Sequence, residues 1–342
     1  MKILFDGRVF VHKKNTGIEN HALHIFESLK KKIQIDIVIP KYKNKYYSQF
    51  WEHFILPFKA KGYDVLFCPS NIAPFLLSKN TKLIVTLHDL AFKDFYKMYS
   101  FLFRKYYELL IPRVVKRADI VLTISNFSFN RIQSEFSFLE NKLKFIHHGI
   151  SKNFYYNKTV KKEKFLLYVG SMNDTKNFSS VLKMYEILDE IEYELILVMP
   201  TNSIFKLDSS IKDLLEKAKI NPNIKIIDFM RQDELCYYYQ KAKLFVFPSY
   251  HESFGFPILE AMACGTPVVC SNTTSLPEIG KDAVIYCDPY DINDIKEKVQ
   301  LVLNDEELQK KMIKKGLNRV KQFTWEKCAQ RHIEIFNQVS ER

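Results

Sequence analysis

The sequence predicts an α/β protein with two doubly wound, parallel-sheet domains. The chain has 342 residues, which is too long for one ordinary core and fits two domains of about 150 residues each. Short apolar runs alternate with segments of helical periodicity in both halves, as in parallel sheets covered by helices. Polar segments directly follow these runs, where ligands gather in such sheets. We therefore expect one domain at 1–155, a second at 156–323 and a terminal helix at 324–342.

In the first half, a polar and basic loop at 6–15 separates the first strand from the first helix. Apolar residues from Ile18 to Leu29 recur at helical spacing, and Pro112 is expected to kink or break a later helix. The expected strands are 2–5, 33–40, 64–68, 82–87, 120–124 and 144–147. The expected helices are 18–32, 100–117 and 126–138, and 41–62 is expected to be irregular or helical.

A polar, lysine-rich linker at 151–163 leads into the second half, which repeats the alternation of strands and helices. This repetition favours two similar sheets. The expected strands are 165–169, 194–199, 224–227, 244–247, 267–270 and 283–286. The expected helices are 177–190, 209–219, 233–241, 291–303, 306–323 and 324–339.

Composition indicates a globular, cytoplasmic protein. Hydrophobic residues make up 47% of the chain and charged residues 26%, which excludes a disordered chain. No apolar run approaches the roughly 18 residues of a membrane span, and Asp6 interrupts a signal-like start. The six cysteines include no Cys-x-x-Cys pair, which favours buried free thiols.

The net charge of +12 is concentrated in the first half. Residues 1–160 hold 26 Lys and Arg against 12 Asp and Glu, whereas residues 161–342 hold 25 against 27. A basic half indicates an anionic partner such as a membrane surface, a phosphate-bearing acceptor or nucleic acid. A lysine-rich solvated face explains the charge equally well. Nucleic acid is the least favoured partner, because no nucleic-acid-binding motif accompanies the charge.

The stretch 249–272 predicts a glycine-bearing loop, a short helix and a strand. Pro257 suits the first helical position, and Gly265 marks the end of the helix. We expect Glu252 in the loop and Glu260 in the first helical turn. A helix start freed by a glycine attracts anions, so these acids need a role other than binding phosphate. On periodicity alone, helix-dipole partners or surface acids are the commoner explanation.

Two further places carry candidate chemistry. Gly170 and Lys176 lie in a loop between a strand and a helix and form a plausible phosphate cradle, although the loop is not a Walker A motif. A solvated surface lysine is the alternative. His88 ends a strand and is either a general acid or base or a partly buried, hydrogen-bonded residue. No His, Cys or Asp cluster has metal-ligand spacing, so a metal-independent site is expected.

These residues resemble a known family. The phrase 251–269 is similar to the Glu-x7-Glu signature of glycosyltransferase family 4, the retaining enzymes of GT-B fold. Further similarities occur in matching order along almost the entire chain. They are Thr16-Gly17-Ile18, Thr86 to Asp89, Ile124-Ser125-Asn126, His148-Gly149-Ile150, Tyr168 to Ser171, Lys176-Asn177, Pro248-Ser249, Ser275 to Glu278 and Phe323-Thr324-Trp325.

The resemblance implies a role for each matching residue. Glu260 would hold the ribose of a nucleotide-sugar donor, Lys176 its diphosphate, and Glu252 would lie near the sugar ring. The implied donor-binding residues are Gly17, Ser171, Lys176, Phe254, Gly255, Phe256 and Glu260. The implied catalytic residues are His88, Lys176 and Glu252. Many members carry Arg where this chain has Ser171, which leaves Lys176 and the helix dipole to stabilise the leaving group.

The implied function is retaining, metal-independent transfer of a hexosyl group to a lipid-linked or oligosaccharide acceptor in O-antigen, lipopolysaccharide or capsule synthesis. GDP-mannose is the first candidate donor, and no cofactor is expected beyond the donor. The basic half would hold the acceptor against the cytoplasmic membrane face, and the last helix would cross back onto the first domain. The alternatives are a UDP-sugar donor, a GT-B nucleotide-sugar epimerase, and a non-catalytic protein that binds a sugar, nucleotide or nucleic acid.

Overall fold

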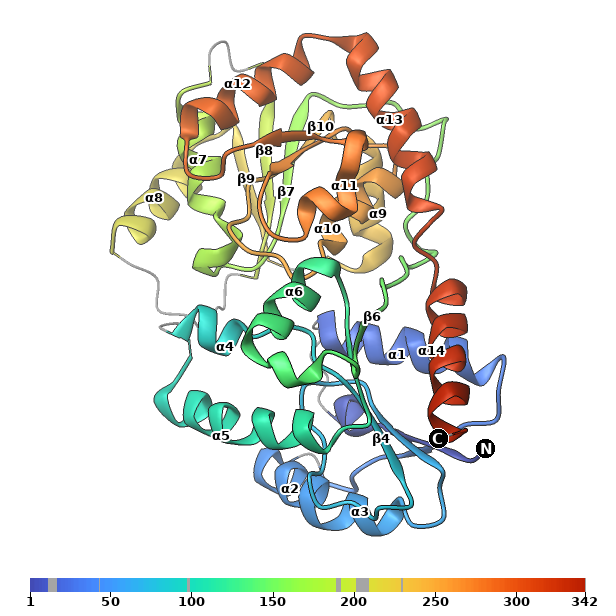
Figure 1. Ribbon diagram of the computed structural model, residues 1–342. Coiled ribbons are helices and arrows are strands. Elements are labelled where there is room, and N and C mark those ends of the chain that lie inside the picture. Colours follow the sequence, from blue (N-terminus) through green and yellow to red (C-terminus); the bar gives the residue numbers. More distant parts are fainter. Residues whose placement is uncertain are drawn as a thin grey trace. The chain divides into compact units, whose positions relative to one another are not determined.

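The computed structural model describes residues 1–11, 17–42, 44–96, 99–188, 192–200, 209–228 and 230–341. The chain forms two compact units, Met1–Gly149 with Thr324–Arg342, and Ile150–Phe323. Each unit is a six-stranded parallel sheet with helices packed against it (Figure 1). The predicted class, two doubly wound parallel sheets, is confirmed. The first unit ends at Gly149, whereas the sequence analysis places that boundary at residue 155.

In the first unit the strand order is β2-β1-β3-β4-β5-β6, and every neighbouring pair is parallel. The strands are β1 (Ile3–Asp6), β2 (Asp36–Val38), β3 (Val65–Cys68), β4 (Lys82–Thr86), β5 (Ile120–Thr123) and β6 (Leu143–Phe145). The helices are α1 (Gly17–Lys30), α2 (Lys45–Phe50), α3 (Leu56–Lys59), α4 (Ala91–Asp94), α5 (Phe101–Arg117), α6 (Asn126–Glu135) and α14 (Trp325–Ser340). Short 3-10 helices η1 (Arg8–Val11) and η4 (Ser137–Leu139) and a π-helix, η2 (Trp51–Ile55), complete the unit.

In the second unit the strand order is β12-β11-β10-β7-β8-β9, again parallel throughout. The strands are β7 (Phe165–Val169), β8 (Glu194–Val198), β9 (Ile224–Ile227), β10 (Leu244–Phe247), β11 (Val268–Ser271) and β12 (Ile285–Cys287). The helices are α7 (Phe178–Glu186), α8 (Ser209–Ile220), α9 (Gln232–Lys241), α10 (Phe256–Ala263), α11 (Leu276–Gly280), α12 (Ile292–Leu303) and α13 (Glu306–Val320), with short 3-10 turns η5 (Asp174–Lys176) and η6 (Lys281–Ala283).

Most predicted elements are present, with differences at their ends. Pro112 lies inside α5, which continues to Arg117, so the proline does not end the helix. Helix α13 ends at Val320 and not at 323. Helix α7 ends at Glu186, short of the predicted end at 190, and residues 189–191 lie outside the described part of the chain. The short α4 and α11 were not predicted, since four or five residues give too little periodicity to detect.

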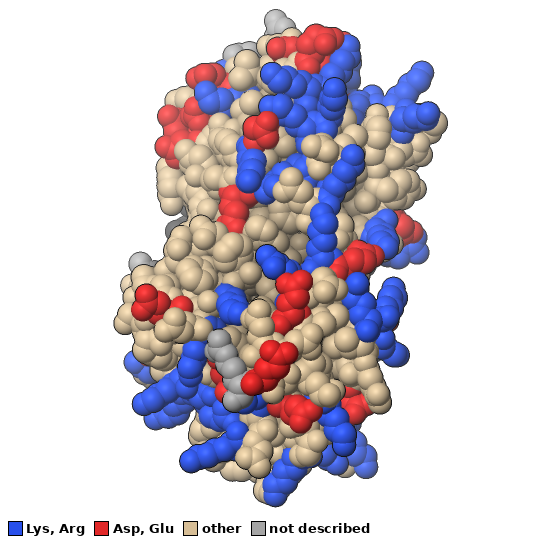
Figure 2. Space-filling view, turned by 45° about the vertical axis from the view of Figure 1, so that its right-hand side comes forward, with Lys and Arg blue, Asp and Glu red and all other residues tan. Residues whose placement is uncertain are grey.

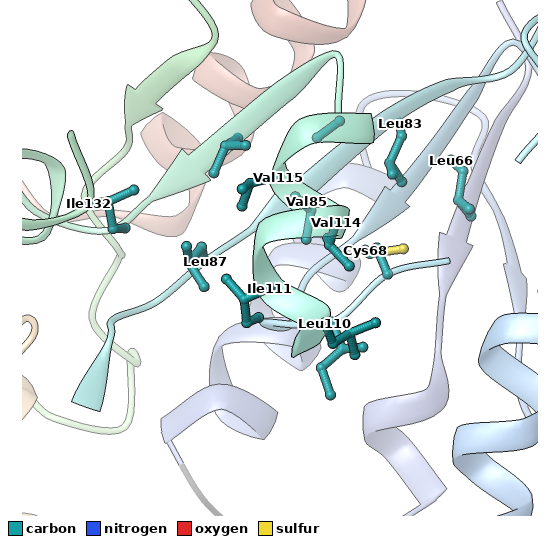
Figure 3. Close-up of a cluster of buried hydrophobic side chains, with 14 of the residues drawn as sticks. Leu66, Cys68, Leu83, Val85, Leu87, Leu110, Ile111, Val114, Val115 and Ile132 are labelled. Atoms are coloured by element: carbon teal, nitrogen blue, oxygen red, sulfur yellow. The ribbon is translucent and has the colours of Figure 1, made fainter. Parts of the chain in front are cut away.

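Local sequence explains why these elements form. The central strands are continuous apolar runs buried on both faces, as expected for parallel sheets. Several helices begin at a side chain that accepts a hydrogen bond from a backbone N–H of the first turn, which satisfies an otherwise unpaired donor. These capping residues are Ser100, Ser125, Asp291, Asp305 and Thr324. Figure 3 shows how α5 lays Leu110, Ile111 and Val114 against the strands of the first sheet.

A cluster of buried histidines lies in the core of the first unit. The rings of His21 and His148 are 4.1 Å apart, and His148 stacks on Trp325 of α14 at 5.6 Å. His332 packs on Phe67 at 5.3 Å. Burial lowers the pKa of His21 and His148 well below the usual value and that of His332 to about 4. These imidazoles are therefore neutral at pH 7.

All six cysteines fall within the described residues, and each is a buried free thiol, as predicted. None of the helices that the structure describes has the length and apolar character needed to cross a lipid bilayer.

Candidate active site

The candidate site of the second unit lies at the point where the order of adding strands to the sheet reverses. From β7 the chain builds β8 and β9 on one side, and it returns to place β10 on the other side. Because β7 and β10 are parallel neighbours, the loops at their carboxyl ends emerge at the same edge. Such a topological switch point is where open α/β sheets bind ligands.

The loop after β7 is fixed by two asparagines. Asn173 accepts a hydrogen bond from the backbone N–H of Lys176 (3.1 Å). Asn177 has φ 54°, in the left-handed region, and its amide donates to the carbonyls of Pro248 (2.8 Å) and Pro289 (3.0 Å). One buried side chain therefore joins the loops that follow β7, β10 and β12.

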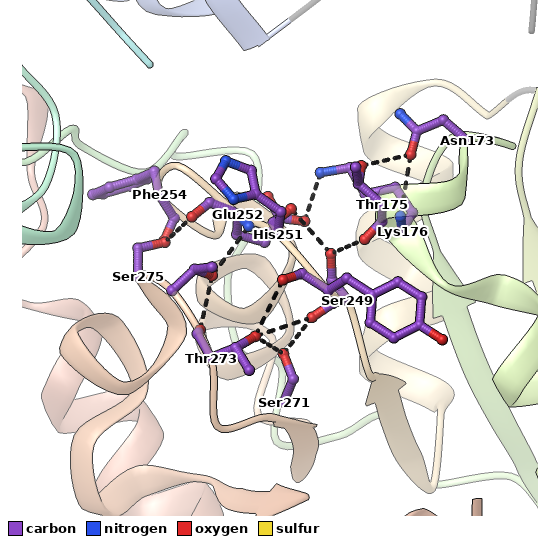
Figure 4. A network of polar contacts seen from close by, with 12 residues as sticks. Asn173, Thr175, Lys176, Ser249, His251, Glu252, Phe254, Ser271, Thr273 and Ser275 are labelled. Atoms are coloured by element: carbon purple, nitrogen blue, oxygen red, sulfur yellow. Dashed lines mark hydrogen bonds and ion pairs between the residues drawn. The ribbon is translucent and has the colours of Figure 1, made fainter. Parts of the chain in front are cut away.

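Hydroxyl groups fix the loop after β10 (Figure 4). Ser249 donates to the carbonyl of Thr175 (2.8 Å), and Ser271 donates to the carbonyl of Ser249 (2.6 Å). Ser275 donates to the carbonyls of Glu252 (2.8 Å) and Phe254 (2.9 Å). Buried backbone carbonyls are thus satisfied by side chains, which holds an irregular loop in one conformation.

Lys176 and Glu252 meet at this switch point. Lys176 Nζ lies 2.6 Å from Glu252 Oε1, and the side chains are 24% and 9% exposed. Charge-assisted hydrogen bonds of this length are strong in a partly buried setting. The lysine thus places its Nζ atom at this sheet edge, against an acid whose backbone is held by the hydroxyl groups of Thr274 and Ser275. Both residues were candidates from the sequence, but their ion pair was not predicted, because they are 76 residues apart.

Helix α10 starts at the same edge. Gly255 precedes it with φ 111°, a conformation that favours glycine, and a Cβ there would lie 2.8 Å from Leu276 Cδ2. Pro257 lies in the first turn, as predicted. The expectation that Glu260 also lies in the first turn is wrong, because α10 starts at Phe256 and no acid occupies that turn. Glu260 lies one turn further along.

Glu260 is half-buried between α9 and α10 and accepts a hydrogen bond from the hydroxyl of Tyr239 (3.2 Å). Burial raises the pKa of Glu260 to about 7, although the hydrogen bond from Tyr239 works in the opposite direction. A carboxyl group with this pKa is an acceptor whose charge changes near neutral pH. Tyr239 has no motif around it, and sequence reasoning missed it.

The remaining residues predicted in the second unit also follow these two strands. The backbone carbonyl of Ser171 accepts from the N–H of Asn173 (2.8 Å). Phe254 is buried, and its ring lies 5.1 Å from that of Phe256. The second unit therefore brings Ser171, Lys176, Glu252, Phe254, Gly255 and Phe256 to one sheet edge, with Glu260 on the helix that starts there.

Gly17 and His88 belong to the first unit. Gly17 begins α1 and is exposed, and its motif neighbour Thr16 lies outside the described residues. His88 is buried after β4, with Nε2 3.0 Å from the carbonyl of Pro69 and its backbone N–H donating to Asn71 Oδ1 (2.8 Å). Burial lowers the pKa of His88, so its ring is neutral at pH 7. Its role in chemistry stays a prediction.

The structure also shows a charged cluster that sequence reasoning missed. Arg8, the first residue of η1, pairs with the buried carboxyl of Glu52 (3.2 Å) and lies 3.9 Å from a carboxyl oxygen of Asp6. Glu52 is far away in sequence, on the π-helix η2, within a stretch that has no recognisable motif. Among the described residues, no group of three or more His, Cys, Asp or Glu side chains is arranged to hold a metal ion.

Comparison with known proteins follows this architecture. Two six-stranded parallel sheets, each covered by helices, place the chain in the GT-B class of α/β folds. Residues 151–319 match the model described as glycosyl transferases group 1, and residues 37–154 match the model of glycosyltransferase family 4. The chain belongs to the glycosyltransferases of family 4.

Individual relatives agree with this assignment. The chain is 29% identical to O-antigen chain mannosyltransferase B of Escherichia coli over 278 residues, 77% of this chain and 72% of that one. It is 30% identical to O-antigen chain mannosyltransferase RfbU of Salmonella typhimurium over 67% of this chain and 62% of that one. The solved structure of Anabaena HepE with UDP and glucose superposes with a TM-score of 0.74 at 16% identity, covering 99% of this chain and 100% of the other.

Proposed function

We propose that this glycosyltransferase moves a hexosyl group, with retention, from a nucleotide sugar to a lipid-linked or oligosaccharide acceptor in O-antigen, lipopolysaccharide or capsule synthesis. The first candidate donor is GDP-mannose, because two relatives are named as O-antigen mannosyltransferases. The observation that carries the proposal is the pair of Lys176 and Glu252 at the switch point of the second sheet.

In this proposal the donor lies along the carboxyl edge of the second sheet. Lys176 binds the diphosphate, and the backbone N–H groups at the start of α10 add further donors. Glu260 accepts hydrogen bonds from the ribose hydroxyls. Glu252 faces the sugar ring once the diphosphate competes with it for the lysine. Fixed donors of this kind stabilise negative charge without reorganisation during the reaction.

The chemistry then needs no carboxylate nucleophile. The acceptor oxygen bonds to the anomeric carbon while the bond from that carbon to the diphosphate breaks, and the leaving phosphate takes the acceptor proton. Lys176 supports the charge that develops on the diphosphate, a task shared by Arg in many relatives but not by Ser171 here. Glu252 is held by Lys176 and by hydroxyls bonded to its backbone, so it positions the sugar and does not attack it.

A donor screen tests the proposal directly. Thermal unfolding is measured with GDP, UDP, ADP, GDP-mannose and UDP-glucose, because a ligand at one hundred times its Kd stabilises the folded state by about 2.7 kcal/mol. We expect GDP and GDP-mannose to give the largest shifts. The variant Lys176→Ala should lose the shift and at least about 100-fold in kcat. The exposed Lys183 on the following helix, α7, provides the control variant Lys183→Ala, which should keep both. Wild-type turnover by Lys176→Ala would remove the diphosphate assignment.

We further propose that the first unit docks on an anionic lipid surface. Figure 2 shows lysine and arginine side chains spread over the face in view with acids among them, so charge alone does not define a docking face. Exposed apolar side chains indicate where such a face lies. Phe50, Phe54 and Phe58 follow one another at helical spacing and are 54%, 55% and 68% exposed. Apolar rings among lysines are typical of proteins that lie on lipid headgroups.

Helix α5 also carries exposed leucines. Leu102, Lys105 and Leu109 lie on its outer side, opposite the residues buried against the sheet. The helix packs beside η2, since His53 Nε2 lies 3.1 Å from the hydroxyl of Tyr106. We call Phe50, Phe54, Phe58, Leu102 and Leu109 the apolar docking face.

Vesicle sedimentation tests this part. The protein should bind vesicles containing phosphatidylglycerol at low salt and lose binding as salt screens the charges. The double variant Phe50→Ser with Phe54→Ser should weaken binding at least about tenfold. Ile220 of the second unit is equally apolar and 84% exposed, so Ile220→Ser is the matched control and should bind like wild type. Equal binding of both variants would reject the docking face.

A further inference from the structure

The first sheet has a switch point of its own, between β1 and β3. From β1 the chain builds β2 on one side and then β3 on the other, so the loops after β1 and β3 leave the same edge. A pocket of about 250 Å³ opens there. Its lining consists of Arg8, Val9, Ile18, Glu19, Ser70, Asn71, Ile72 and Tyr107, all of the first unit.

Arg8 is held in this pocket by buried acids. Its guanidinium lies 3.2 Å from Glu52 Oε2 and 3.9 Å from Asp6 Oδ2, and both carboxyl groups are fully buried. Its Nη2 donates to Ser70 Oγ, at the pocket wall (2.9 Å). The acids therefore lie behind the guanidinium and fix its plane, while the arginine itself lines the cavity.

Opposite charges face one another in this cluster. Burial opposes the charge on Arg8, but the carboxyl groups of Glu52 and Asp6 raise its pKa, so the guanidinium stays positive. Burial raises the pKa of Glu52 to about 8, despite the opposing effect of Arg8. Burial also raises the pKa of Asp6, whereas the guanidinium and the N–H of Arg8, which donates to Asp6 Oδ1 (3.0 Å), favour its ionised form. Two buried carboxyl groups thus face one guanidinium, and a third acid, Glu19, lines the pocket near the start of α1.

This pairing of charges decides the class of ligand. A guanidinium whose charge is already compensated has little Coulomb attraction left for a phosphate or a carboxylate. It still offers a planar set of N–H donors that match a pair of hydroxyl oxygens. A tyrosine and aliphatic side chains complete a wall suited to the apolar face of a sugar ring. The volume is below the roughly 300–1,000 Å³ of pockets for drug-sized ligands, which limits the ligand to about one ring.

We propose that this pocket binds one neutral sugar unit of the acceptor, with Arg8 as the specificity-determining residue that engages its hydroxyl groups and disfavours an anionic unit. The proposal rests on the proposed glycosyl transfer and adds the chemical class of the acceptor end. Asn71 links the pocket to the candidate chemistry, because it lines the cavity and accepts the backbone N–H of His88.

Saturation-transfer NMR on the full chain tests the binding without requiring turnover. The probes are methyl α-mannoside, methyl β-glucuronide and inorganic phosphate, each with saturating GDP. Wild type should bind the neutral glycoside at least about fivefold more strongly than either anion. Arg8→Met should lose glycoside binding and keep GDP binding. Lys176→Ala should lose GDP binding and keep glycoside binding. Preference for phosphate, or binding that Arg8→Met leaves intact, would overturn the proposal.

Two further variants keep the test valid if Arg8→Met fails to fold. Ile18→Phe narrows the pocket at a partly exposed position and leaves the buried charges alone, so it should also lose the glycoside. Asp6→Asn removes the balancing carboxylate and should shift the preference toward methyl β-glucuronide. Retained glycoside binding in Ile18→Phe would reject the pocket. If no glycosyl transfer occurs but glycoside binding depends on Arg8, the proposed function fails and the sugar site stands. If glycosyl transfer occurs but glycoside binding does not depend on Arg8, only the sugar site is rejected.

Discussion

The two units use the same topology and place a cation against acids at each switch point, but the acids differ in number and in burial. In the second unit Lys176 pairs with one acid, Glu252, and the two side chains are 24% and 9% exposed. In the first unit Arg8 faces two carboxyl groups that are fully buried. A lysine with one competing carboxylate can exchange it for a diphosphate. An arginine held by two acids cannot be released in this way, and it is suited to neutral hydroxyl groups.

The hydrogen bonding around the two switch points also differs. In the second unit hydroxyl and amide side chains satisfy the loop carbonyls around the site. In the first unit, buried polar atoms that accept or donate no hydrogen bond among the described residues include both oxygens of Glu52 and both ring nitrogens of His21. Buried polar groups without such bonds cost stability unless they become neutral. The loops at the second edge are thus held by hydrogen bonds, whereas the stability of the first unit depends on the protonation states of its buried acids and histidines.

The largest expected effect is therefore a loss of stability of the first unit in acid. The folded-state pKa of His332 is about 4, below the roughly 6.5 of an unfolded histidine. The stabilising contribution is complete above pH 6.5 and is lost progressively as the pH falls toward 4. Between pH 7 and pH 5 this amounts to about 2 kcal/mol for His332. His21 and His148 shift in the same direction and add to it.

Tryptophan fluorescence measures this loss separately from the rest of the chain. Trp51 and Trp325, the two tryptophans of the sequence, both belong to the first unit. The free energy of unfolding, measured by urea titration and tryptophan fluorescence, should fall from pH 7 to pH 5. The variant His332→Phe keeps an aromatic ring against Phe67 and should lose part of the pH dependence. A fluorescence transition that is the same at both pH values would contradict the neutral cluster.

The second unit should be broken most easily at Asn177. Asn177→Ala removes two hydrogen bonds and leaves the buried carbonyls of Pro248 and Pro289 unpaired, at about 1–3 kcal/mol each. Alanine at φ 54° adds strain of about 1 kcal/mol. We expect a total loss of about 3–7 kcal/mol in the circular dichroism transition, with a smaller change in tryptophan fluorescence.

Asn177→Gly separates the two causes. Glycine adopts the left-handed conformation without strain but also lacks the amide, so it should be more stable than the alanine variant by about 1 kcal/mol. If Asn177→Ala unfolds both units equally in fluorescence and circular dichroism, the units are one cooperative system and the contrast between them does not hold.

The sequence was sufficient to predict the fold and the sheet edge that carries the candidate site. The alternation of apolar runs and helical segments is local, and it predicted both sheets with small errors at the ends of elements. Gly255 and Pro257 mark their backbone conformations in the sequence. Lys176 and Glu252 were selected from the loops that follow two predicted strands, and the resemblance to the family supplied their implied roles.

The pairings could not be predicted, because they depend on packing between distant segments. Tyr239 meets Glu260 across two helices, and no spacing in the sequence indicates that contact. Glu52 reaches Arg8 only because the π-helix η2 turns it into the core, and a π-helix has no reliable sequence signal. Glu260 was assigned to the wrong helical turn because Gly255 allows a tight entry that leaves Phe256 as the first helical residue.

The exchange of partners proposed for Lys176 predicts an effect of intermediate size. Glu252→Gln removes the carboxylate that competes for the lysine and keeps a side chain of the same shape. We expect the affinity for GDP to rise about tenfold, while kcat falls because the sugar is no longer positioned. Isothermal titration with GDP and an initial-rate assay measure the two effects. Weaker GDP binding in Glu252→Gln would mean that the carboxylate helps to hold the diphosphate and does not compete with it.

The smallest expected effect concerns the protonation of Glu260. Its pKa of about 7 predicts that the carboxylate is lost as the pH falls below 7, so the Kd for GDP should rise about tenfold from pH 8 to pH 6. The hydroxyl of Tyr239 stabilises the ionised form, and Tyr239→Phe removes it while leaving the ring in place against Phe245. The midpoint of the Kd profile should therefore move to higher pH by up to about 1 unit. Glu260→Gln should remove the pH dependence at similar fold stability. A profile that Tyr239→Phe leaves unmoved would show that Glu260 does not control donor binding, and the donor affinity would then rest on Lys176 and the start of α10.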